Sequence, residues 1–143
     1  HLNIDYFEEP IQCPNEESLQ KIKNKHNIKI AIDESIYDGS NYKLWLQKDL
    51  INSIIIKPSI LGGYKKFFKL CTLCQKYNIN IILSSALESS IGNMATIHLA
   101  AAVNNNYEHG LNIHSFYNDF VNQPIYKKNV SIINLDKLIG LGI

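Results

Sequence analysis

The sequence predicts an α/β fold in which parallel strands alternate with helices, and two observations indicate it. Short apolar runs such as SIII and INIIL are typical of strands that are covered on both faces of a parallel sheet. A stretch with helical spacing of apolar residues follows each run, so that the unit repeats at roughly 25-residue intervals, the length of a strand, a helix and two loops. Such units are expected to be connected by right-handed crossovers.

The boundaries of the elements follow from these patterns and from the residues that interrupt them. Strands are predicted over residues 4–8, 28–33, 52–57, 79–84 and, more briefly, 110–114. Helices, with apolar residues three or four apart, are predicted over residues 15–26, 40–50, 64–77 and 90–103. Asn15 is expected to cap the first helix, and Ser40 or Asn41 the second. Pro58, Gly62 and Gly63 predict a loop after the third strand.

Composition limits the class of protein. The chain has 143 residues, enough for one domain with a sizeable core, and a net charge of +1. It has no basic patch interleaved with aromatic residues and no apolar stretch of about 18 residues, so neither nucleic acid nor a membrane is expected as a partner. Three cysteines without a framework, Cys13, Cys71 and Cys74, predict a reducing compartment, for which we expect the cytoplasm or the plastid stroma.

Polar residues follow the apolar runs, at the point where each predicted strand ends. Glu8, Asp33, Lys57 and Ser84 are separated by 25, 24 and 27 residues, so consecutive parallel strands deliver them to the same edge of the sheet. That edge is where (β/α) barrels and open α/β sheets carry their chemistry. Two carboxylates and a lysine gathered there predict a divalent metal and a charged acid/base partner.

Each of these residues also has a simpler explanation. Glu8 and Glu9 fit a solvated pair in the loop, and Asp33 and Glu34 fit the N-terminal cap of the next turn. Lys57 is harder to explain in this way, because it follows an apolar run and buried lysines are rare.

Packing is the preferred explanation for several other polar residues. Tyr37 and Tyr64 follow strand ends, where packing is favoured over a place in the site, and His98 is expected to pack on an Ala-rich helix. Cys71 and Cys74 are expected to fill space on a helix face, since a zinc site needs four ligands.

The ordered motifs YFEEP, IAIDES, IIIKPSILGG, SSALESSIG and GLNI resemble the C-terminal half of the barrel in the enolase superfamily, within the muconate-lactonising subgroup. The SSALESSIG stretch and the GL that follows are most similar to the o-succinylbenzoate synthases. The resemblance implies that residues 1–143 are the C-terminal portion of a (β/α) TIM-type barrel domain, without the N-terminal capping domain and the first barrel strands. A complete barrel needs about 250 residues, so four and a half units are about half of one.

The resemblance also implies roles for individual residues. Glu8 and Asp33 match the family's second and third metal ligands, for Mg²⁺, and Lys57 matches the lysine at the end of the sixth barrel strand. Contacts with the substrate are implied for Ser84, Ser85, Glu88, Ser89 and Gly110. The family also uses an aspartate ligand and a K-x-K lysine from two earlier strands, and we expect neither of these strands in this chain, whose own KIKNK run at 21–25 falls in a predicted helix.

The activity implied is a lyase reaction on a small-molecule carboxylate. It is the magnesium-dependent syn dehydration of 2-succinyl-6-hydroxy-2,4-cyclohexadiene-1-carboxylate to 2-succinylbenzoate, in menaquinone or phylloquinone biosynthesis. N-acylamino acid racemases and dipeptide epimerases share the same motifs, and a non-catalytic remnant is the third alternative. Either a missing N-terminal half or a further copy of the chain is expected as a partner. A bound cation is expected to lower the pKa of Lys57, which then serves as acid/base or as a stabilising charge.

Overall fold

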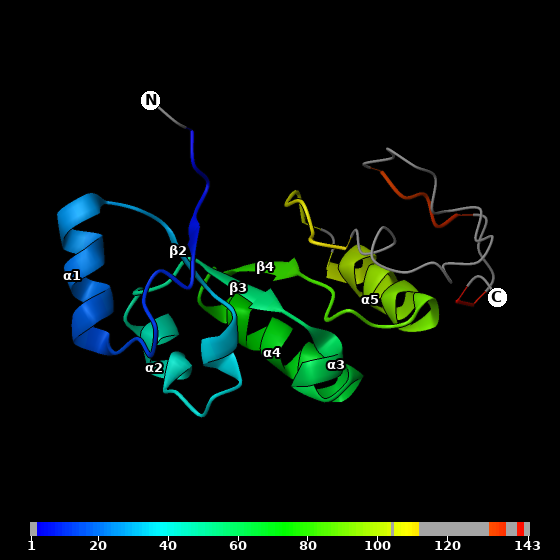
Figure 1. Ribbon diagram of the computed structural model, residues 1–143, viewed down its shortest axis with the longest axis horizontal. Coiled ribbons are helices and arrows are strands. Elements are labelled where there is room, and N and C mark those ends of the chain that lie inside the picture. Colours follow the sequence, from blue (N-terminus) through cyan, green and yellow to red (C-terminus); the bar gives the residue numbers. More distant parts are fainter. Residues whose placement is uncertain (1–2, 104, 112–131, 137–139, 142–143) are drawn as a thin grey trace.

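Four parallel strands form the centre of the computed structural model, which describes residues 3–103, 105–111, 132–136 and 140–141 (Figure 1). The strands lie in chain order and are β1 (Phe7–Glu8), β2 (Ile30–Ile32), β3 (Ser53–Ile56) and β4 (Asn80–Leu83). All three neighbouring pairs are parallel, as a run of βαβ units requires. The predicted α/β class is therefore confirmed, although each strand is shorter than the sequence predicted.

Helices fill the connections between the strands. They are α1 (Glu16–His26), the 3-10 turn η1 (Glu34–Ile36), α2 (Tyr42–Gln47), α3 (Pro58–Leu61), α4 (Tyr64–Lys76) and α5 (Ser90–Val103). Figure 1 shows α2, α3 and α4 on one side of the strands, while the N-terminal segment rises from the other side. No helix in the described part of the chain is long and apolar enough to cross a membrane.

The ends of the helices follow local sequence signals. Asn15 caps α1 as predicted, because its side chain accepts a hydrogen bond from the Ser18 N–H and the Ser18 hydroxyl accepts one from Asn15 N–H. Asn41 precedes α2 but makes no capping bond with its side chain, and α2 ends at Gln47, short of the predicted boundary.

The prediction of a simple loop after β3 was wrong, because residues 58–61 form the short helix α3. Pro58 lies at its first turn, where a missing N–H costs nothing, and Gly62 ends it with a φ of 95°. The predicted strand over 110–114 is represented by one parallel bridge between Gly110 and Ser84, and its residues from 112 onward lie outside the described part. So does most of the C-terminal segment.

The main core lies between the sheet and the helices. One face of the strands contributes Ile30, Ile32, Ile54, Ile56, Ile81 and Leu83, and these pack with helix residues that include Trp45, Phe67, Cys71 and Cys74. Burial raises the pKa of the Cys71 thiol to about 11 and that of Cys74 to about 12. Both cysteines are free and buried, so their predicted role as packing residues is confirmed.

The opposite face of the sheet leads to the polar residues. Ala31, Ile55 and Ile82 form a separate small cluster there, with Tyr6 packed against it. Side chains alternate along a strand, so the residue two positions after each of these lies on the same face. By that alternation Asp33, Lys57 and Ser84 follow Ala31, Ile55 and Ile82 at the carboxyl edge of the sheet.

Candidate active site at the carboxyl edge of the sheet

An ion pair between Lys57 and Asp33 is the centre of the candidate site. The Lys57 ammonium group contacts the Asp33 Oδ2, and Glu34 Oε1 lies 3.8 Å from the same nitrogen. Asp33 is only 2% exposed, so this carboxylate has left water almost completely. Although Asp33 precedes η1, its side chain makes no capping bond there, which argues against the simple capping explanation.

Asp33 keeps one carboxylate oxygen without a partner. Its Oδ1 is buried and accepts no hydrogen bond from the described residues. Burial raises the pKa of Asp33, although the hydrogen bond and the positive charge of Lys57 act in the opposite direction. A buried acceptor without a donor costs free energy, so an orphan oxygen of this kind needs an explanation such as an ion.

Glu8 brings a second carboxyl group close to Asp33. Partial burial of the Glu8 carboxyl raises its pKa, the negative charge of Asp33 raises it further, and Lys57 partly offsets both effects. Two carboxylates that repel each other favour a cation between them, because the cation stabilises both charged forms. The arrangement therefore fits the predicted metal ligands, Glu8 and Asp33.

The described residues do not form a complete metal site. Among the described residues, no group of three His, Cys, Asp or Glu side chains is arranged to hold a metal ion. The carboxylates of Glu8 and Asp33, the latter with its unpartnered Oδ1, fit two of the three ligands that the family resemblance implies. A hard cation such as Mg²⁺ is held by oxygen ligands of this type.

Glu9 holds the turn that carries Asp33. Its Oε2 accepts hydrogen bonds from the backbone N–H of Asp33, at 2.9 Å, and of Ser35, at 3.4 Å, while its Oε1 accepts one from the Ser35 hydroxyl. Glu9 therefore links the end of β1 to the turn after β2 and holds the backbone of Asp33, so it is not simply a solvated loop residue. In the sequence, the only signal for this contact was that Glu9 directly follows Glu8.

Tyr37 reaches from the same turn to Lys57. The Lys57 backbone N–H donates to the Tyr37 hydroxyl oxygen at 2.7 Å. Burial raises the pKa of Tyr37 to about 12, and the charges of Asp33 and Glu34 add to that shift, so the phenol stays protonated at neutral pH. Tyr37 packs against the core as predicted, but its hydroxyl contact with the site was not predicted.

The pKa of Lys57 is raised by its surroundings. Burial lowers it, but the hydrogen bond to Asp33 and the negative charges of Asp33, Glu34 and Glu8 together outweigh that effect. The sequence predicted a lowered pKa beside a cation, and the protein groups alone shift the pKa in the opposite direction. The electrostatics of this edge are therefore dominated by its carboxylates.

Ser84 and Ser85 follow β4 and border the same edge. Ser84 forms the parallel bridge to Gly110, and a side chain at Gly110 would approach the Ser84 hydroxyl to 3.2 Å. The Ser85 hydroxyl donates to the Asn93 Oδ1 at 2.5 Å, and Asn93 Nδ2 donates to the Leu111 carbonyl at 3.2 Å. Asn93, which is fully buried on α5, was not singled out in the sequence, where a polar residue in an Ala-rich helix was the only signal.

Glu88 and Ser89 lie further along the same loop, where local contacts hold them. Glu88 accepts hydrogen bonds from the Ser59 hydroxyl at 3.0 Å and from the Ala86 N–H at 2.9 Å. Ser89 directly precedes α5, and its hydroxyl accepts from Gly92 N–H at 3.3 Å. Four of the predicted substrate residues thus lie between β4 and α5, and Gly110 lies beside them after α5, while their contact with a substrate stays a prediction.

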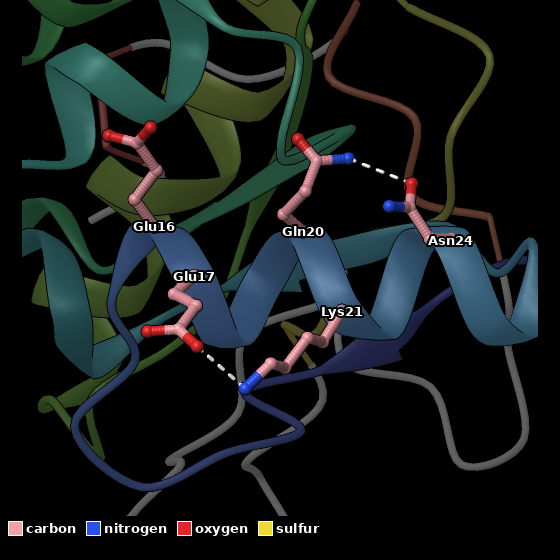
Figure 2. A pocket seen from close by; sticks show the side chains of 5 residues that line it. All are labelled: Glu16, Glu17, Gln20, Lys21 and Asn24. Carbon is pink, nitrogen blue, oxygen red and sulfur yellow. Dashed lines mark hydrogen bonds and ion pairs between the residues drawn. The ribbon is translucent and has the colours of Figure 1, made fainter.

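A shallow hollow on the outer face of α1 lies on another part of the molecule. Figure 2 shows that its polar side chains largely satisfy one another: Lys21 pairs with Glu17 at 2.6 Å, and Gln20 donates to Asn24 at 2.9 Å. It shares no residue with the ion pair of Lys57 and Asp33, and we assign it no function.

The fold and the site together define a parallel α/β unit with a carboxylate–lysine centre at the carboxyl ends of its strands. A sequence profile of the family described as "Enolase C-terminal domain-like" matches residues 1–143. The chain belongs to this family, and the fold class predicted from the sequence is confirmed by the match.

Known proteins of more than one activity are similar to the chain. It is 30% identical over 101 residues to an L-Ala-D/L-Glu epimerase of Clostridium acetobutylicum, covering 71% of the chain and 28% of that protein. It is 29% identical over 136 residues to an o-succinylbenzoate synthase of Pasteurella multocida, covering 93% and 40%. The crystal structure of a dipeptide epimerase from Enterococcus faecalis V583 superimposes with a TM-score of 0.66 at 29% identity, covering 76% of the chain and 32% of the other. The chain therefore spans well under half the length of these relatives.

Proposed function

We propose that the chain is the C-terminal barrel portion of a magnesium-dependent enzyme that removes a proton next to a carboxylate, and that this enzyme is an o-succinylbenzoate synthase. The observation that carries the enzyme class is the Lys57–Asp33 ion pair with the free Asp33 Oδ1 beside Glu8. A lysine ammonium and two carboxylates at one edge are the groups that such a reaction needs, because negative charge develops on the substrate carboxylate.

In this proposal the residues of the chain have separate tasks. Glu8 and Asp33 hold the divalent cation, which when bound supplies positive charge for the substrate carboxylate. Lys57 adds a fixed positive charge beside it, and Glu9 and Tyr37 hold the backbone on which Asp33 and Lys57 stand. The loop of Ser84, Ser85, Glu88 and Ser89, with Gly110, borders the space left for the remaining arm of the substrate.

The choice of dehydration over racemisation rests on the similarity to known proteins. The alignment with the o-succinylbenzoate synthase of Pasteurella multocida covers 93% of the chain and includes the SSALESSIG loop. Epimerisation is the second candidate, because the epimerase of Clostridium acetobutylicum and the dipeptide epimerase structure match most of the chain at similar identity. The third metal ligand and the K-x-K lysine would come from another part of the protein or from another subunit.

Activity assays of the protein as its gene encodes it, with Mg²⁺ added, distinguish these functions. We expect 2-succinylbenzoate to form from 2-succinyl-6-hydroxy-2,4-cyclohexadiene-1-carboxylate, which absorbance or mass spectrometry measures. Deuterium exchange at the α-carbon of an N-acylamino acid and of a dipeptide is measured in parallel. Rapid exchange without dehydration would replace our first choice by the second. If the protein shows neither activity, the non-catalytic remnant is the alternative that remains.

A further inference from the structure

We propose that Tyr37 is a positioning residue for Lys57. Its hydroxyl accepts the backbone hydrogen bond that a neighbouring strand would otherwise accept at the end of β3, and so fixes the position of the Lys57 backbone. The proposal deepens the function given above and rests on it for its kinetic part.

The backbone of Lys57 needs a partner that β2 does not provide. Ile56 directs its carbonyl toward β4, where it accepts from Ser84 N–H at 2.9 Å. Since successive residues of a parallel strand direct their polar groups to opposite sides, the Lys57 N–H points toward β2. However, β2 ends at Ile32, and the chain turns into η1 at Glu34, so no β2 carbonyl continues alongside.

The Tyr37 hydroxyl fills this position. It accepts from the Lys57 N–H at 2.7 Å, a short and well-formed hydrogen bond. The Lys57 carbonyl accepts from the Leu61 N–H of α3 at 3.0 Å, and the Tyr37 hydroxyl donates to the same oxygen at the longer distance of 3.5 Å. Both backbone groups of Lys57 are therefore fixed, and the side chain has a defined starting point from which to reach Asp33.

Tyr37 itself is firmly placed. Its N–H donates to the Glu34 carbonyl at 2.9 Å, and its ring packs against the main core cluster. The same turn carries Asp33, which Glu9 holds from the other side. One turn after β2 thus sets the positions of both members of the ion pair, and Tyr37 is the part of it that acts on the lysine.

The test compares Tyr37→Phe with Tyr42→Phe in the protein as its gene encodes it. The first change removes the hydroxyl, and with it the acceptor for Lys57 N–H and the long contact to the Lys57 carbonyl, but keeps the ring. Tyr42 is a matched control, since it is also half-buried against the same core and its hydroxyl has no hydrogen-bond partner among the described residues. Hydrogen exchange measures the protection of the Lys57 amide, which we expect to fall by about tenfold or more in Tyr37→Phe only. Unchanged protection would overturn the proposal, whatever reaction the protein catalyses.

A double-mutant cycle tests the action through Lys57. We expect Tyr37→Phe to lower kcat by roughly 10- to 100-fold, with KM and the Mg²⁺ concentration for half-maximal rate nearly unchanged. In a Lys57→Ala background the same change should have almost no effect, because the positioned group is absent. Equal losses in both backgrounds would show that Tyr37 has only a structural role. If the unmutated protein turns over neither substrate, the proposed function fails, while the exchange experiment still decides whether Tyr37 holds Lys57.

Discussion

Lys57 and Asp33 meet across the carboxyl ends of β3 and β2 although 24 residues separate them in the chain. The ammonium group takes one oxygen of the carboxylate, and the other oxygen stays buried without a donor among the described residues. This asymmetry lets one aspartate orient a lysine and still offer an oxygen to a cation. The predictions below depend largely on it.

The first prediction concerns the charge of Lys57. If Lys57 stabilises developing negative charge, Lys57→Ala should lower dehydration by roughly two to three orders of magnitude, the usual effect of removing one such group. Lys57→Arg should keep part of the rate, because it keeps the charge in a different geometry. Lys21→Ala is the control, since Lys21 forms an exposed pair with Glu17 on α1. A dehydration rate that is unchanged in Lys57→Ala would refute the role.

The second prediction concerns the metal ligands. Asp33→Asn and Glu8→Gln keep the size of each side chain but remove a negative charge, so both should abolish turnover and raise the Mg²⁺ concentration that the enzyme requires. Residues 1–143 alone should bind Mg²⁺ only above about the millimolar range, because two carboxylates hold this ion poorly. Calorimetry measures the binding, and Glu17→Gln serves as control. A wild-type turnover rate in Asp33→Asn or Glu8→Gln would refute the assignment of that residue as a metal ligand.

The third prediction concerns the stability of the turn after β2. Glu9→Gln replaces a carboxylate that accepts from Asp33 N–H, Ser35 N–H and the Ser35 hydroxyl, and the amide cannot accept all three. We expect the free energy of unfolding to fall by about 1–3 kcal/mol, as measured by denaturant titration. Glu17→Gln, which loses one exposed helix pair, should leave the free energy of unfolding nearly unchanged. Equal small losses in the two variants would mean that Glu9 does not hold the turn.

The fourth prediction concerns acid stability at His109. Its Nδ1 accepts from the Leu83 N–H at 3.1 Å, and burial lowers its pKa from the ordinary value of 6.5. The folded state therefore favours the neutral ring, so its stabilising contribution is complete above pH 6.5 and is lost as the pH falls through the lower folded pKa.

Hydrogen exchange of the Leu83 amide, followed from about pH 7.5 to about pH 5 and corrected for the intrinsic pH dependence, measures this effect. In His109→Gln the side-chain carbonyl can still accept but does not titrate, so we expect a flatter profile. His26→Gln, at an exposed position on α1, should leave the profile unchanged. The same steep loss of protection in His109→Gln would show that another group is responsible.

The sequence by itself determined the order of the elements and the edge at which the site lies. Apolar runs such as SIII are typical of strands covered on both faces, and the spacing of Glu8, Asp33, Lys57 and Ser84 matched one strand–helix unit each. Local signals also sufficed for the cap of α1 at Asn15 and for the buried face of α4. These features depend on neighbours three or four residues apart, or on simple alternation, and both are visible in a linear sequence.

The tertiary structure decided which polar groups touch. The contact of Tyr37 with the Lys57 backbone spans 20 residues, and those of Glu9 with Asp33 and Ser35 span 24 and 26. Such contacts follow from the register of parallel strands and from where each strand stops, and neither is encoded in a local pattern. Helix α3 was missed because Pro58 and Gly62 favour a loop as strongly as the two ends of a single helical turn. The unpartnered Asp33 Oδ1 also came from burial, since only packing removes the water that would otherwise bind it.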